Sequence, residues 1–543
     1  MRHWWEDAVF YQIYPRSFAD SNGDGIGDLA GIRGKLGYLE GLGIDALWIS
    51  PFFKSPMKDF GYDVSDYRDI DPMFGTLGDL KNLISEAKGR GIRIVLDLVA
   101  NHSSDEHPWF VEARSSKDSP KHGWYLWTPD SGRPPNNWKA VFELGSAWHP
   151  NPATGERYLG TFTRHQPEFD WRNTELRSAI YDIMRFWFDL GVDGFRLDVA
   201  TGYLKDAALR SNPFSLKANP DFFQRHIYDR NQSEVHGIFK EMRSVADAAG
   251  ERVLIGETHG QDPILAASCH GKAGDELNMA FNFEFLYRPW SARSFRESAQ
   301  RWYKLLPEGA WPNFTLSNHD QPRHAWRYRG RGLGRDGAAR VSDGRARVAA
   351  AMLLTLRGTP FLYYGEEIGM TCERLPRAAL RDPLGIATWP LRSLGRDPER
   401  TPMQWDSEPN SGFSSAPSEG SGRPWLPLNS DYRSRNAAVQ AADPMSLLSW
   451  YKALIALRRS RRELREGGIA FLDLAPDVLA YERTGREGDG VIVLLNFASR
   501  CRRFEFARGG RVLLGSARSA GAEIEAGSIE LGPCEAVLAE LVG

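Results

Sequence analysis

Four segments of the sequence place acidic or histidine side chains directly after short apolar runs. They are residues 97–102, residues 196–198, Glu257 after the run 253–256, and residues 318–320. One charged residue at the end of an apolar strand can simply form an ion pair. Four such ends in one chain are better explained by a shared site, because parallel α/β folds gather their reactive groups at the carboxyl ends of the strands.

Asp198 and Glu257 have the side chains that hydrolysis of a glycosidic bond requires. That reaction uses one ionised carboxylate at the sugar carbon and one protonated carboxyl group at the leaving oxygen. Arg196 lies two residues before Asp198, on the same face of a strand, where its guanidinium would lower the pKa of Asp198. Glu257 follows an apolar run, which would raise its pKa. Three further residues could contact the substrate: Asp320, His102 and His319.

Short apolar runs alternate with helical patterns along most of the chain. Between two such runs, Thr76 can cap a helix with Asp79 three residues on, and a second helix is expected over 174–190, ended by Gly191. Strands that are apolar throughout and separated by helices predict a parallel sheet covered by helices, and eight of them predict an α/β fold of the (β/α)8 barrel type. The predicted strands are 9–13, 46–49, 92–96, 194–199, 253–257, 280–283, 314–317 and 361–364.

Two parts of the chain depart from this alternation. About 70 residues rich in Pro, Trp, Asn and Gly follow the third strand, which is too long for an ordinary loop. From about Gly467, short alternating strands follow one another without helices, as in an antiparallel β-sandwich. We predict a barrel over 1–102 and 172–465, an inserted domain over 103–171, and a C-terminal sandwich over 466–543.

The composition is that of an ordinary globular protein, with 42% hydrophobic and 25% charged residues. A formal net charge of -2 gives no strong field of one sign, so neither nucleic acid nor a membrane is expected as a partner. No apolar run is long enough to span a bilayer, and the first residues lack the pattern of a secretion signal. The four cysteines are scattered without a CxxC pair, which favours the cytoplasm over an oxidising compartment. The composition leaves open whether the protein is a monomer or a homo-oligomer.

Together, the four segments resemble the signature regions of the α-amylase superfamily (glycoside hydrolase family 13). They read DLVANH over 97–102, GFRLD over 194–198, Glu257, and NHD over 318–320, in that order. The resemblance covers nearly the whole chain, including the inserted domain and the sandwich. It implies a retaining mechanism with Asp198 as nucleophile, Glu257 as acid/base and Asp320 as stabiliser of the transition state. Retention requires the first two carboxyl groups to lie roughly 5–5.5 Å apart.

Other segments resemble the exo-acting α-glucosidases and oligo-1,6-glucosidases of that family. The segment 59–63 is similar to the one whose Asp and Tyr close the pocket around the terminal glucose. Residues 166–171 resemble the QPDLNW region but differ from it at 168–170. Segments 395–397 and 400–405 match a further region, in which Arg400 would pair with the sugar of the −1 site or with Asp59. The substrate-binding residues implied are Asp59, Tyr62, His102, Phe142, Phe162, Gln166, Arg196, Val199, His319 and Arg400.

The residue after the nucleophile bears on linkage preference. In this subgroup it tends to be Val in enzymes that act on α-1,6 bonds and Thr in those that act on α-1,4 bonds. Val199 has no hydroxyl group to bond an α-1,4-linked acceptor, which favours substrates like isomaltose. The alternative is that Val199 is simply a β-branched strand residue, which leaves maltose-type substrates open.

A loop near the start of the chain carries possible ligands for a hard cation at alternate positions: Asp20, Asn22, Asp24, Ile26 and Asp28. This spacing resembles the first nine positions of an EF-hand loop, although Gly31 replaces the bidentate Glu and the loop follows a strand. Four side chains and one carbonyl could hold the ion, and the family resemblance favours a structural Ca²⁺, or Mg²⁺, remote from the chemistry. A polar turn without metal is the alternative. No organic cofactor is expected.

Three alternatives to an α-glucosidase were weighed. Trehalose synthases, trehalose-6-phosphate hydrolases, sucrose isomerases and amylosucrases share the four segments, but residues 321–327 lack the RLDRD stretch of sucrose isomerases, and the sequence shows no counterpart of the extra amylosucrase domain. Heavy chains of amino-acid transporters have lost the carboxylates that this chain retains. An endo-acting amylase would need an open site, which Asp59, Tyr62 and Arg400 oppose. We predict a retaining, exo-acting α-glucosidase on short α-glucosides, isomaltose- or maltose-type, that also transfers glucose to acceptors.

Overall fold

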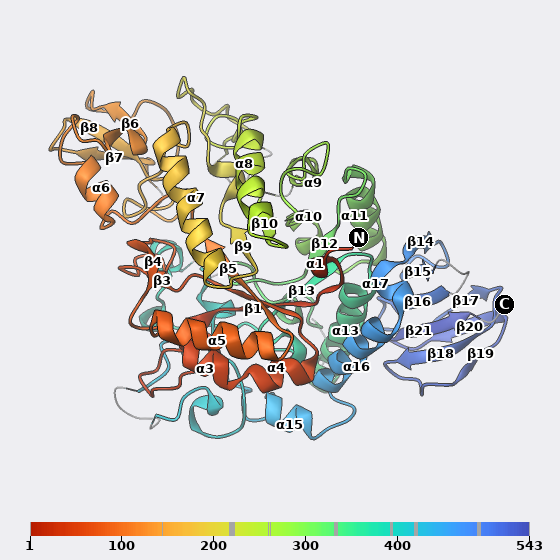
Figure 1. The fold of residues 1–543 in the computed structure, drawn as a ribbon. Coiled ribbons are helices and arrows are strands. Elements are labelled where there is room, and N and C mark those ends of the chain that lie inside the picture. Colours follow the sequence, from red (N-terminus) through yellow and green to blue (C-terminus); the bar gives the residue numbers. More distant parts are fainter. Residues whose placement is uncertain are drawn as a thin grey trace.

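A sheet of eight parallel strands forms the centre of the molecule, with helices around it (Figure 1). The computed structural model describes residues 2–143, 145–216, 223–258, 260, 262–330, 335–390, 395–416, 422–485 and 490–541. The strand order β11-β10-β9-β5-β2-β1-β13-β12 is that of a barrel opened between β11 and β12. Asn313 Nδ2 donates a hydrogen bond of 3.0 Å to the Ala280 carbonyl across that junction. The predicted (β/α)8 barrel is confirmed.

The barrel strands lie close to the predicted runs, although several are shorter. They are β1 (Phe10–Ile13), β2 (Ala46–Ile49), β5 (Arg93–Leu98), β9 (Gly194–Leu197), β10 (Val253–Gly256), β11 (Met279–Ala280), β12 (Asn313–Thr315) and β13 (Thr359–Tyr363). Several predicted ends differ from the structure, and two of the differences bear on the description below. Strand β9 stops before Asp198, and Phe283 begins the helix α10 (Phe283–Leu286) instead of ending a strand.

The strands are apolar throughout because both of their faces are buried. One set of side chains, including Phe10, Trp48, Val95, Ile255 and Phe361, packs together as a separate cluster inside the barrel. The opposite set packs against the surrounding helices. Because side chains alternate along a strand, the residues two positions beyond these inner ones also face the barrel axis and approach its carboxyl end. This alternation turns Asp97 and Glu257 toward the barrel axis near its carboxyl end.

The predicted helix starts and stops are present. In α5 (Leu77–Gly89) the Thr76 side chain accepts from the Asp79 N–H, and the Asp79 carboxylate accepts from the Thr76 N–H, which is a capping box. Helix α7 (Thr174–Asp189) ends before Gly191, which has a φ of 101°. The other helices are α1 (Trp4–Asp7), α2 (Pro15–Phe18), α3 (Leu29–Gly34), α4 (Leu36–Leu42), α6 (Pro108–Ala113), α8 (Val235–Ala248), α9 (Pro263–Ser268), α11 (Ala292–Leu305), α12 (His324–Arg327), α13 (Arg335–Thr355), α14 (Pro383–Ala387), α15 (Ala437–Ala441), α16 (Leu447–Ser460) and α17 (Arg462–Glu466). Short 3-10 turns are η1 (His122–Trp124), η2 (Ala200–Gly202), η3 (Glu366–Ile368), η4 (Arg377–Ala379), η5 (Asp397–Glu399) and η6 (Pro409–Gly412).

The segment between β5 and α7 carries its own small sheet beside the barrel. Strands β6 (Trp127–Pro129), β8 (Glu156–Leu159) and β7 (Trp148–Asn151) pair in that order, and Trp138, Trp148 and Leu159 form a separate buried cluster. A two-stranded ribbon, β3 (Phe53–Lys54) with β4 (Asp66–Ile70), lies between the barrel and this segment. Figure 1 shows the small sheet at the far end of the molecule from the C-terminus.

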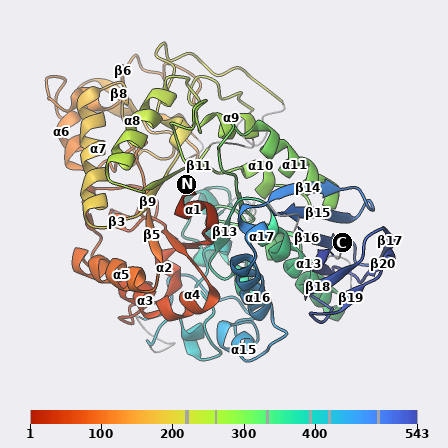
Figure 2. The same ribbon diagram turned by 45° about the vertical axis from the view of Figure 1, so that its right-hand side comes forward.

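The C-terminal part is an antiparallel β-sandwich, as predicted. Its larger sheet has the order β14-β15-β16-β21-β18-β19, and β17 pairs with β20 in a second sheet. The strands are β14 (Gly468–Leu472), β15 (Val478–Thr484), β16 (Gly490–Asn496), β17 (Arg502–Phe506), β18 (Gly510–Gly515), β19 (Glu523–Ile524), β20 (Gly527–Leu531) and β21 (Ala536–Leu541). Figure 2 shows the sandwich beside the barrel, where its strands contact α11, α13 and α17. Among the described residues, none of the helices is both long and apolar enough to cross a bilayer.

Candidate active site

Asp198 and Glu257 flank a single guanidinium group at the carboxyl end of the barrel. Arg196 Nη1 lies 2.7 Å from Asp198 Oδ1, and its Nη2 lies 2.7 Å from Glu257 Oε2. The same Nη1 also lies 2.8 Å from Asp97 Oδ1. Because two nitrogens of one planar group reach both oxygens, the two carboxyl groups lie on one small region of the barrel mouth, as the sequence predicted.

Burial governs the charge of this cluster. It raises the pKa of Asp198 well above its usual range, Glu257 and Asp97 raise it further, and Arg196 opposes them. Burial likewise raises the pKa of Asp97 to about 6. The expectation that Arg196 lowers the pKa of Asp198 was therefore wrong in its net direction, because one guanidinium serves three buried carboxylates. Because the negative charges of these buried carboxylates repel one another, the cluster favours keeping one proton on its carboxyl groups while no substrate is bound.

Val199 forms a tight turn directly above Asp198. Its φ of 49° and ψ of 36° lie in the left-handed region, which is unfavourable for a β-branched residue and costs on the order of 1–3 kcal/mol. In this conformation the Val199 N–H donates to Glu257 Oε2 at 3.0 Å, and the next N–H, of Ala200, donates to the Glu257 carbonyl at 3.0 Å. Val199 is thus a turn residue that fixes Glu257, and the interpretation of it as an ordinary strand residue was wrong.

Asp320 lies beside two arginines and a histidine. Arg400 Nη2 lies 2.7 Å and Arg396 Nη1 3.5 Å from Asp320 Oδ1, and His319 Nε2 lies 3.2 Å from Oδ2. Burial alone would raise the pKa of Asp320, but these three neighbours outweigh it and hold the pKa well below its usual range. Asp320 is therefore ionised at neutral pH.

Of the two alternatives predicted for Arg400, the pairing with Asp59 is not formed, because Arg396 takes that place; the pairing with a sugar of the −1 site stays a prediction. Arg396 Nη2 donates to Asp59 Oδ1 at 2.6 Å and lies 2.7 Å from Asp382 Oδ1. Arg400 instead donates to the His319 carbonyl at 2.7 Å and to Asp320. The turn η5 separates the two arginines by a few residues, and only the folded chain shows which one reaches Asp59. The sequence offered Arg396 within a matching segment but gave no signal for Asp382.

An aromatic and imidazole wall closes this end of the site. The rings of Tyr62 and His319 stack at 5.5 Å with an angle of 3° between their planes, and Tyr62 OH lies 2.5 Å from His319 Nε2. His102 Nε2 lies 2.9 Å from the Tyr62 carbonyl and 3.1 Å from Gln166 Nε2. Burial lowers the pKa of both His102 and His319 to about 3, so both rings are neutral at neutral pH. A neutral imidazole offers one donor and one acceptor.

Two phenylalanines from the inserted segment complete the surroundings. The Phe142 ring lies 4.1 Å from the Arg396 guanidinium and 5.8 Å from the Phe162 ring, which in turn lies 5.3 Å from the His102 ring. Gln166 Nε2 donates to Asp59 Oδ2 at 3.2 Å. Direct contacts therefore link the predicted substrate-binding residues to the predicted catalytic ones around one site.

The predicted cation loop has a partly different role in the structure. Asp20 accepts hydrogen bonds from the N–H groups of Gly23 at 2.7 Å and Gly25 at 2.8 Å. Asp28 caps α3 by accepting from the Gly31 N–H at 2.6 Å, so Gly31 serves as a backbone donor. The described part of the chain contains no group of three or more His, Cys, Asp or Glu side chains placed to hold a metal ion. An ion at this loop would therefore depend on amide and carbonyl oxygens in addition to carboxylates.

The neighbours of this loop are unexpected. Residues 410–416 and 422–432 are partly buried. Ser414 bridges to Asp20, and the Trp425 N–H donates to the Gly25 carbonyl at 3.0 Å. The Trp425 ring lies 6.1 Å from that of Tyr14, which also neighbours Arg400. The loop 20–28 is thus packed against a segment that reaches the site.

Comparisons with known proteins agree with this geometry. The family described as Alpha amylase, catalytic domain, matches residues 12–467. A probable alpha-glucosidase of Rhizobium meliloti is 43% identical over 498 residues, which cover 89% of this chain and 87% of that protein. An oligo-1,6-glucosidase of Parageobacillus thermoglucosidasius is 40% identical over 531 residues, covering 92% and 91%. Among solved structures, the alpha-glucosyl transfer enzyme XgtA has a TM-score of 0.91 at 38% identity, and the trehalulose synthase MutB from Pseudomonas mesoacidophila has 0.89 at 34%; both alignments cover 100% of each chain.

Proposed function

This chain belongs to the α-amylase family and is a glycoside hydrolase, and we propose that it is a retaining, exo-acting α-glucosidase that releases glucose from the non-reducing end of short α-glucosides. The observation that carries the proposal is the group of ion pairs at one end of the site. Arg396 pairs with Asp59 and Asp382 beside the Phe142 ring, and these contacts would block a longer chain beyond one terminal sugar. Names of relatives support a glucosidase but differ in specific activity.

In the proposed reaction Asp198 attacks the anomeric carbon while Glu257 gives its proton to the leaving glycosidic oxygen. The C–O bond to the leaving group breaks, and a covalent glucosyl ester of Asp198 forms. Glu257, now ionised, then takes a proton from water, whose oxygen attacks the same carbon and frees Asp198. The ionised Asp320 would stabilise the positive charge that develops on the sugar.

The mechanism needs one proton within the cluster of carboxyl groups around Arg196. Three carboxylates around Arg196 favour keeping one proton, and a bound sugar that excludes water would strengthen the bond between Arg196 and an ionised Asp198. The two contacts of Arg196 would then serve different charge states: an ion pair with Asp198 and a weaker bond to a neutral Glu257. The Val199 N–H keeps Glu257 Oε2 in place in both states.

We propose a preference for α-1,6 over α-1,4 bonds, with glucosyl transfer to sugars at high concentration. Val199 offers no side-chain hydroxyl beside the proposed proton donor, and several relatives are named oligo-1,6-glucosidases. Transfer follows whenever a sugar hydroxyl replaces water in the second step, and XgtA is named for such a reaction. The likeness to MutB supports one rival, the isomerisation of sucrose.

The test is a kinetic comparison of isomaltose, maltose, sucrose, trehalose and trehalose-6-phosphate, with proton NMR of the first product. We expect α-glucose as the first anomer, the highest kcat/KM on isomaltose, and no fast fall in the viscosity of starch. Release of β-glucose would contradict retention, and a fast viscosity fall would contradict exo action. Conversion of sucrose into an isomeric disaccharide would replace the α-glucosidase with an isomerase.

We further propose that the loop 20–28 binds Ca²⁺, or Mg²⁺, as a structural ion. The donors would be the side-chain oxygens of Asp20, Asn22, Asp24 and Asp28 with the Ile26 carbonyl, all hard oxygen ligands. Because an ion that binds only the folded chain stabilises it, Ca²⁺ at a hundredfold excess over its Kd should add about 2.7 kcal/mol. Calorimetry with and without EGTA tests this, with Asp24→Ala as the variant that should no longer respond. An unchanged Tm in the unaltered protein, together with no metal by mass spectrometry, would contradict it.

We also propose that the protein works in a reducing compartment such as the cytoplasm. All four cysteines are unpaired, and three of them are buried. Only Cys501 is exposed, so oxidation would have one accessible target.

A further inference from the structure

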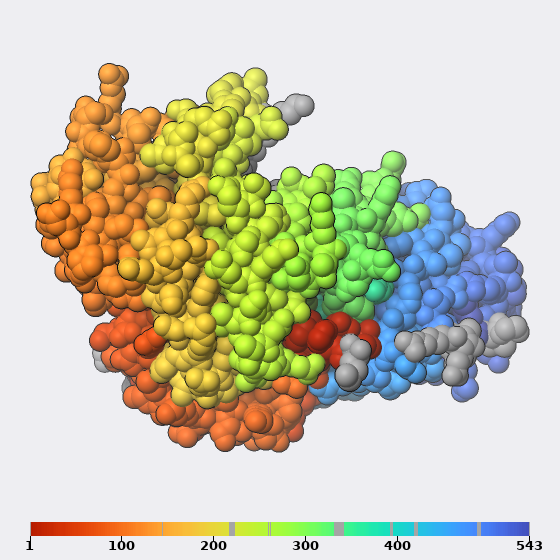
Figure 3. All heavy atoms as spheres, turned by 45° about the horizontal axis from the view of Figure 1, so that its top comes forward, coloured from red at the N-terminus to blue at the C-terminus, as the bar shows by residue number. Residues whose placement is uncertain are grey.

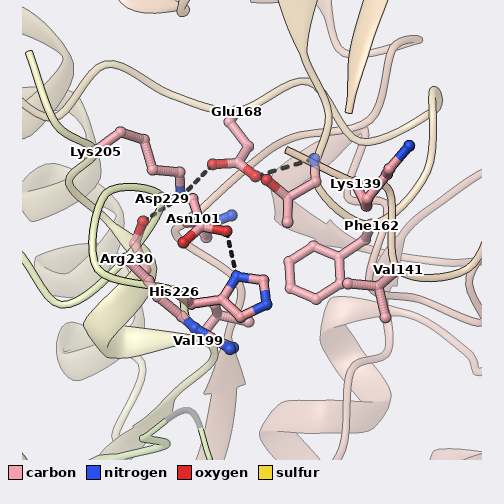
Figure 4. A pocket seen from close by; sticks show the side chains of 12 residues that line it. Asn101, Lys139, Val141, Phe162, Glu168, Val199, Lys205, His226, Asp229 and Arg230 are labelled. Atoms are coloured by element: carbon pink, nitrogen blue, oxygen red, sulfur yellow. Dashed lines mark hydrogen bonds and ion pairs between the residues drawn. The ribbon is translucent and has the colours of Figure 1, made fainter. Parts of the chain in front are cut away.

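Two kinds of buried contact hold the side chains around the site. Where the inserted segment meets the loop after β9, in orange and yellow in Figure 3, the contact is an ion pair. Lys205 Nζ lies 2.5 Å from Glu168 Oε2, and both residues line a small pocket of about 80 Å³ beside Val199 (Figure 4). Within the barrel itself, the contact is a neutral amide, that of Gln12 in β1, and it reaches His319.

Gln12 lies in the layer of side chains next to the apolar cluster inside the barrel. Phe10 of β1 belongs to that cluster, and because side chains alternate along a strand, Gln12 also faces the barrel axis. Gln12 is buried, and its Nε2 lies 2.7 Å from His319 Nδ1 and donates to Ser50 Oγ at 3.2 Å. An amide nitrogen has two hydrogens to donate and does not accept. Toward His319 Nδ1, the Gln12 nitrogen is therefore a donor.

The contacts of the other ring nitrogen of His319 indicate the same protonation state. His319 Nε2 lies 3.2 Å from Asp320 Oδ2, and an ionised carboxylate only accepts hydrogen bonds. Tyr62 OH lies 2.5 Å from the same nitrogen and donates to Asp97 Oδ2 at 3.2 Å, so the Tyr62 oxygen can accept from Nε2. A neutral ring with its proton on Nε2 and a lone pair on Nδ1 satisfies all of these neighbours.

A neutral His319 suits the charge that develops during the reaction. The transition state of glycoside hydrolysis resembles an oxocarbenium ion, so positive charge grows on the sugar. A protonated imidazole beside Asp320 would cancel part of the negative charge that stabilises this ion. Burial lowers the pKa of His319 to about 3, although the charge of Asp320 opposes this shift. The amide of Gln12 acts in the same direction as burial, because it directs a hydrogen at the nitrogen that a second proton would occupy.

We propose that Gln12 is a positioning residue that keeps His319 neutral with its proton on Nε2, so that Nε2 donates a hydrogen bond to Asp320 or to a hydroxyl group of the bound sugar. The part of this inference that concerns the sugar rests on the proposed function, whereas the tautomer of His319 does not. Gln12 acts only through His319, and Ser50 accepts the second hydrogen of the same amide nitrogen.

The first experiment measures the tautomer and needs no substrate. In protein with 15N-labelled histidine, the ring signals of His319 are assigned by their loss in His319→Gln. At neutral pH they should show an unprotonated Nδ1 and a protonated Nε2. Gln12→Glu should place a proton on Nδ1, because a carboxylate accepts from the ring and histidine is the stronger base. A protonated Nδ1 in the unaltered protein would overturn the inference, even if neither variant folds.

The second experiment measures kcat/KM on isomaltose. Gln12→Met, similar in length but without the amide, should lower kcat/KM about 3- to 10-fold, as expected for one lost hydrogen bond. Gln12→Glu should lower it about 10-fold or more, because His319 then becomes a cation or loses its donor at Nε2. Asn496→Leu is the matched control, since Asn496 in β16 is a buried amide that donates to the carbonyls of Arg500 at 2.9 Å and Gly532 at 2.6 Å.

The control should lower Tm and leave both kcat/KM and the His319 signals unchanged. Folded Gln12 variants with the kcat/KM of the unaltered enzyme, or losses that the control matches, would overturn the role of Gln12. If the unaltered enzyme hydrolyses no α-glucoside, the proposed function fails, and the nitrogen signals still decide whether Gln12 sets the tautomer of His319.

Discussion

At the scale of single residues, the roles of Asp198 and Glu257 differ in which face of the sugar each would approach. Both contact Arg196, so their ion pairs alone do not distinguish them. Glu257 receives the Val199 N–H, whereas Asp198 lies deeper, with its side chain 6% exposed against 16% for Glu257. The deeper carboxylate suits attack on the sugar carbon, and the outer one suits proton exchange with a leaving group and then with water.

We expect azide to separate the two roles. Asp198→Ala should abolish hydrolysis of an activated α-glucoside, and added azide should fill the vacated position to give β-glucosyl azide. Glu257→Ala should lose about 10²–10⁴-fold in kcat/KM on isomaltose, and azide should attack the covalent intermediate to give α-glucosyl azide. Proton NMR of the azide products measures the outcome. The opposite pairing of anomers with variants would exchange the two roles.

Val199 combines an unfavourable backbone conformation with a position beside the leaving group. A threonine there keeps the β-branched shape and adds one hydroxyl group. We expect Val199→Thr to shift the ratio of kcat/KM for maltose over isomaltose upward by about 2- to 10-fold, since one hydrogen bond contributes on the order of 0.5–1.5 kcal/mol. Steady-state kinetics on both sugars measures this ratio. Val141→Thr, in the inserted segment, is the comparison, since Val141 and Val199 line the same pocket. A ratio unchanged in both variants would remove Val199 as the linkage determinant.

At the scale of elements, β1, α4 and η3 meet at a buried carboxyl group. Tyr11 OH of β1 donates to Glu367 Oε1 at 2.9 Å, and Tyr38 OH of α4 donates to the same oxygen at 2.7 Å. Burial raises the pKa of Glu367 from its ordinary value of 4.5 to about 7. Since the folded chain holds this proton more tightly than the unfolded chain, its contribution to stability is complete below pH 4.5 and is lost as pH rises through 7.

We therefore expect Glu367→Gln to become more stable relative to the unaltered protein as pH rises. The amide keeps an oxygen for both tyrosines and cannot ionise. Between pH 5 and pH 8 the difference in free energy of unfolding should move in favour of the variant by up to about 3 kcal/mol. Thermal unfolding at several pH values measures this, with the exposed Glu86→Gln on α5 as control. A difference independent of pH, or one that moves the other way, would contradict the ionisation of Glu367 in this window.

At the scale of the whole molecule, one buried arginine joins the barrel to the sandwich and a second lies within the barrel part; both donate to backbone carbonyls. Arg483 of β15 donates to the carbonyls of Thr355, Leu464, Gly467 and Gly468 at 2.6–3.1 Å. Arg458 of α16 donates in the same way to Leu354, Gly358 and Leu464. Burial lowers the pKa of Arg483 to about 10 and that of Arg458 to about 9. Carbonyls at the end of α13 carry the negative end of the helix dipole and so favour these cations.

We expect Arg483→Met to destabilise the protein by about 3 kcal/mol, because it leaves several buried carbonyls without donors. Denaturant unfolding should show the loss, and a separate early transition of the sandwich would locate it. Arg508→Met is the control, since Arg508 forms an exposed ion pair with Glu482 at 2.8 Å, worth about 0–1 kcal/mol. Similar losses in the two variants would show that the buried arginine does not hold the two parts together.

The sequence by itself determined the features that are encoded within one element or at its end. The alternation of apolar runs and helical patterns predicted the barrel, and the change of pattern after Gly467 predicted the sandwich. Thr76 and Asp79 predicted a helix start to the residue. Asp198, Glu257 and Asp320 were found because each directly follows an apolar strand, and strand ends meet at one face of a parallel barrel.

Only the tertiary structure decided how those groups share charges and partners. Asp59 and Arg396 are 337 positions apart, and nothing in their spacing distinguishes Arg396 from Arg400 as the partner. The pKa of Asp198 depends on how much water the fold removes and on two more carboxylates, Asp97 and Glu257, brought from other strands. The neighbouring Arg196 alone therefore predicted the wrong direction for the net pKa shift of Asp198. Local periodicity determines which element carries a residue and where along that element it lies. The charge of its side chain and its specificity depend on contacts between distant segments.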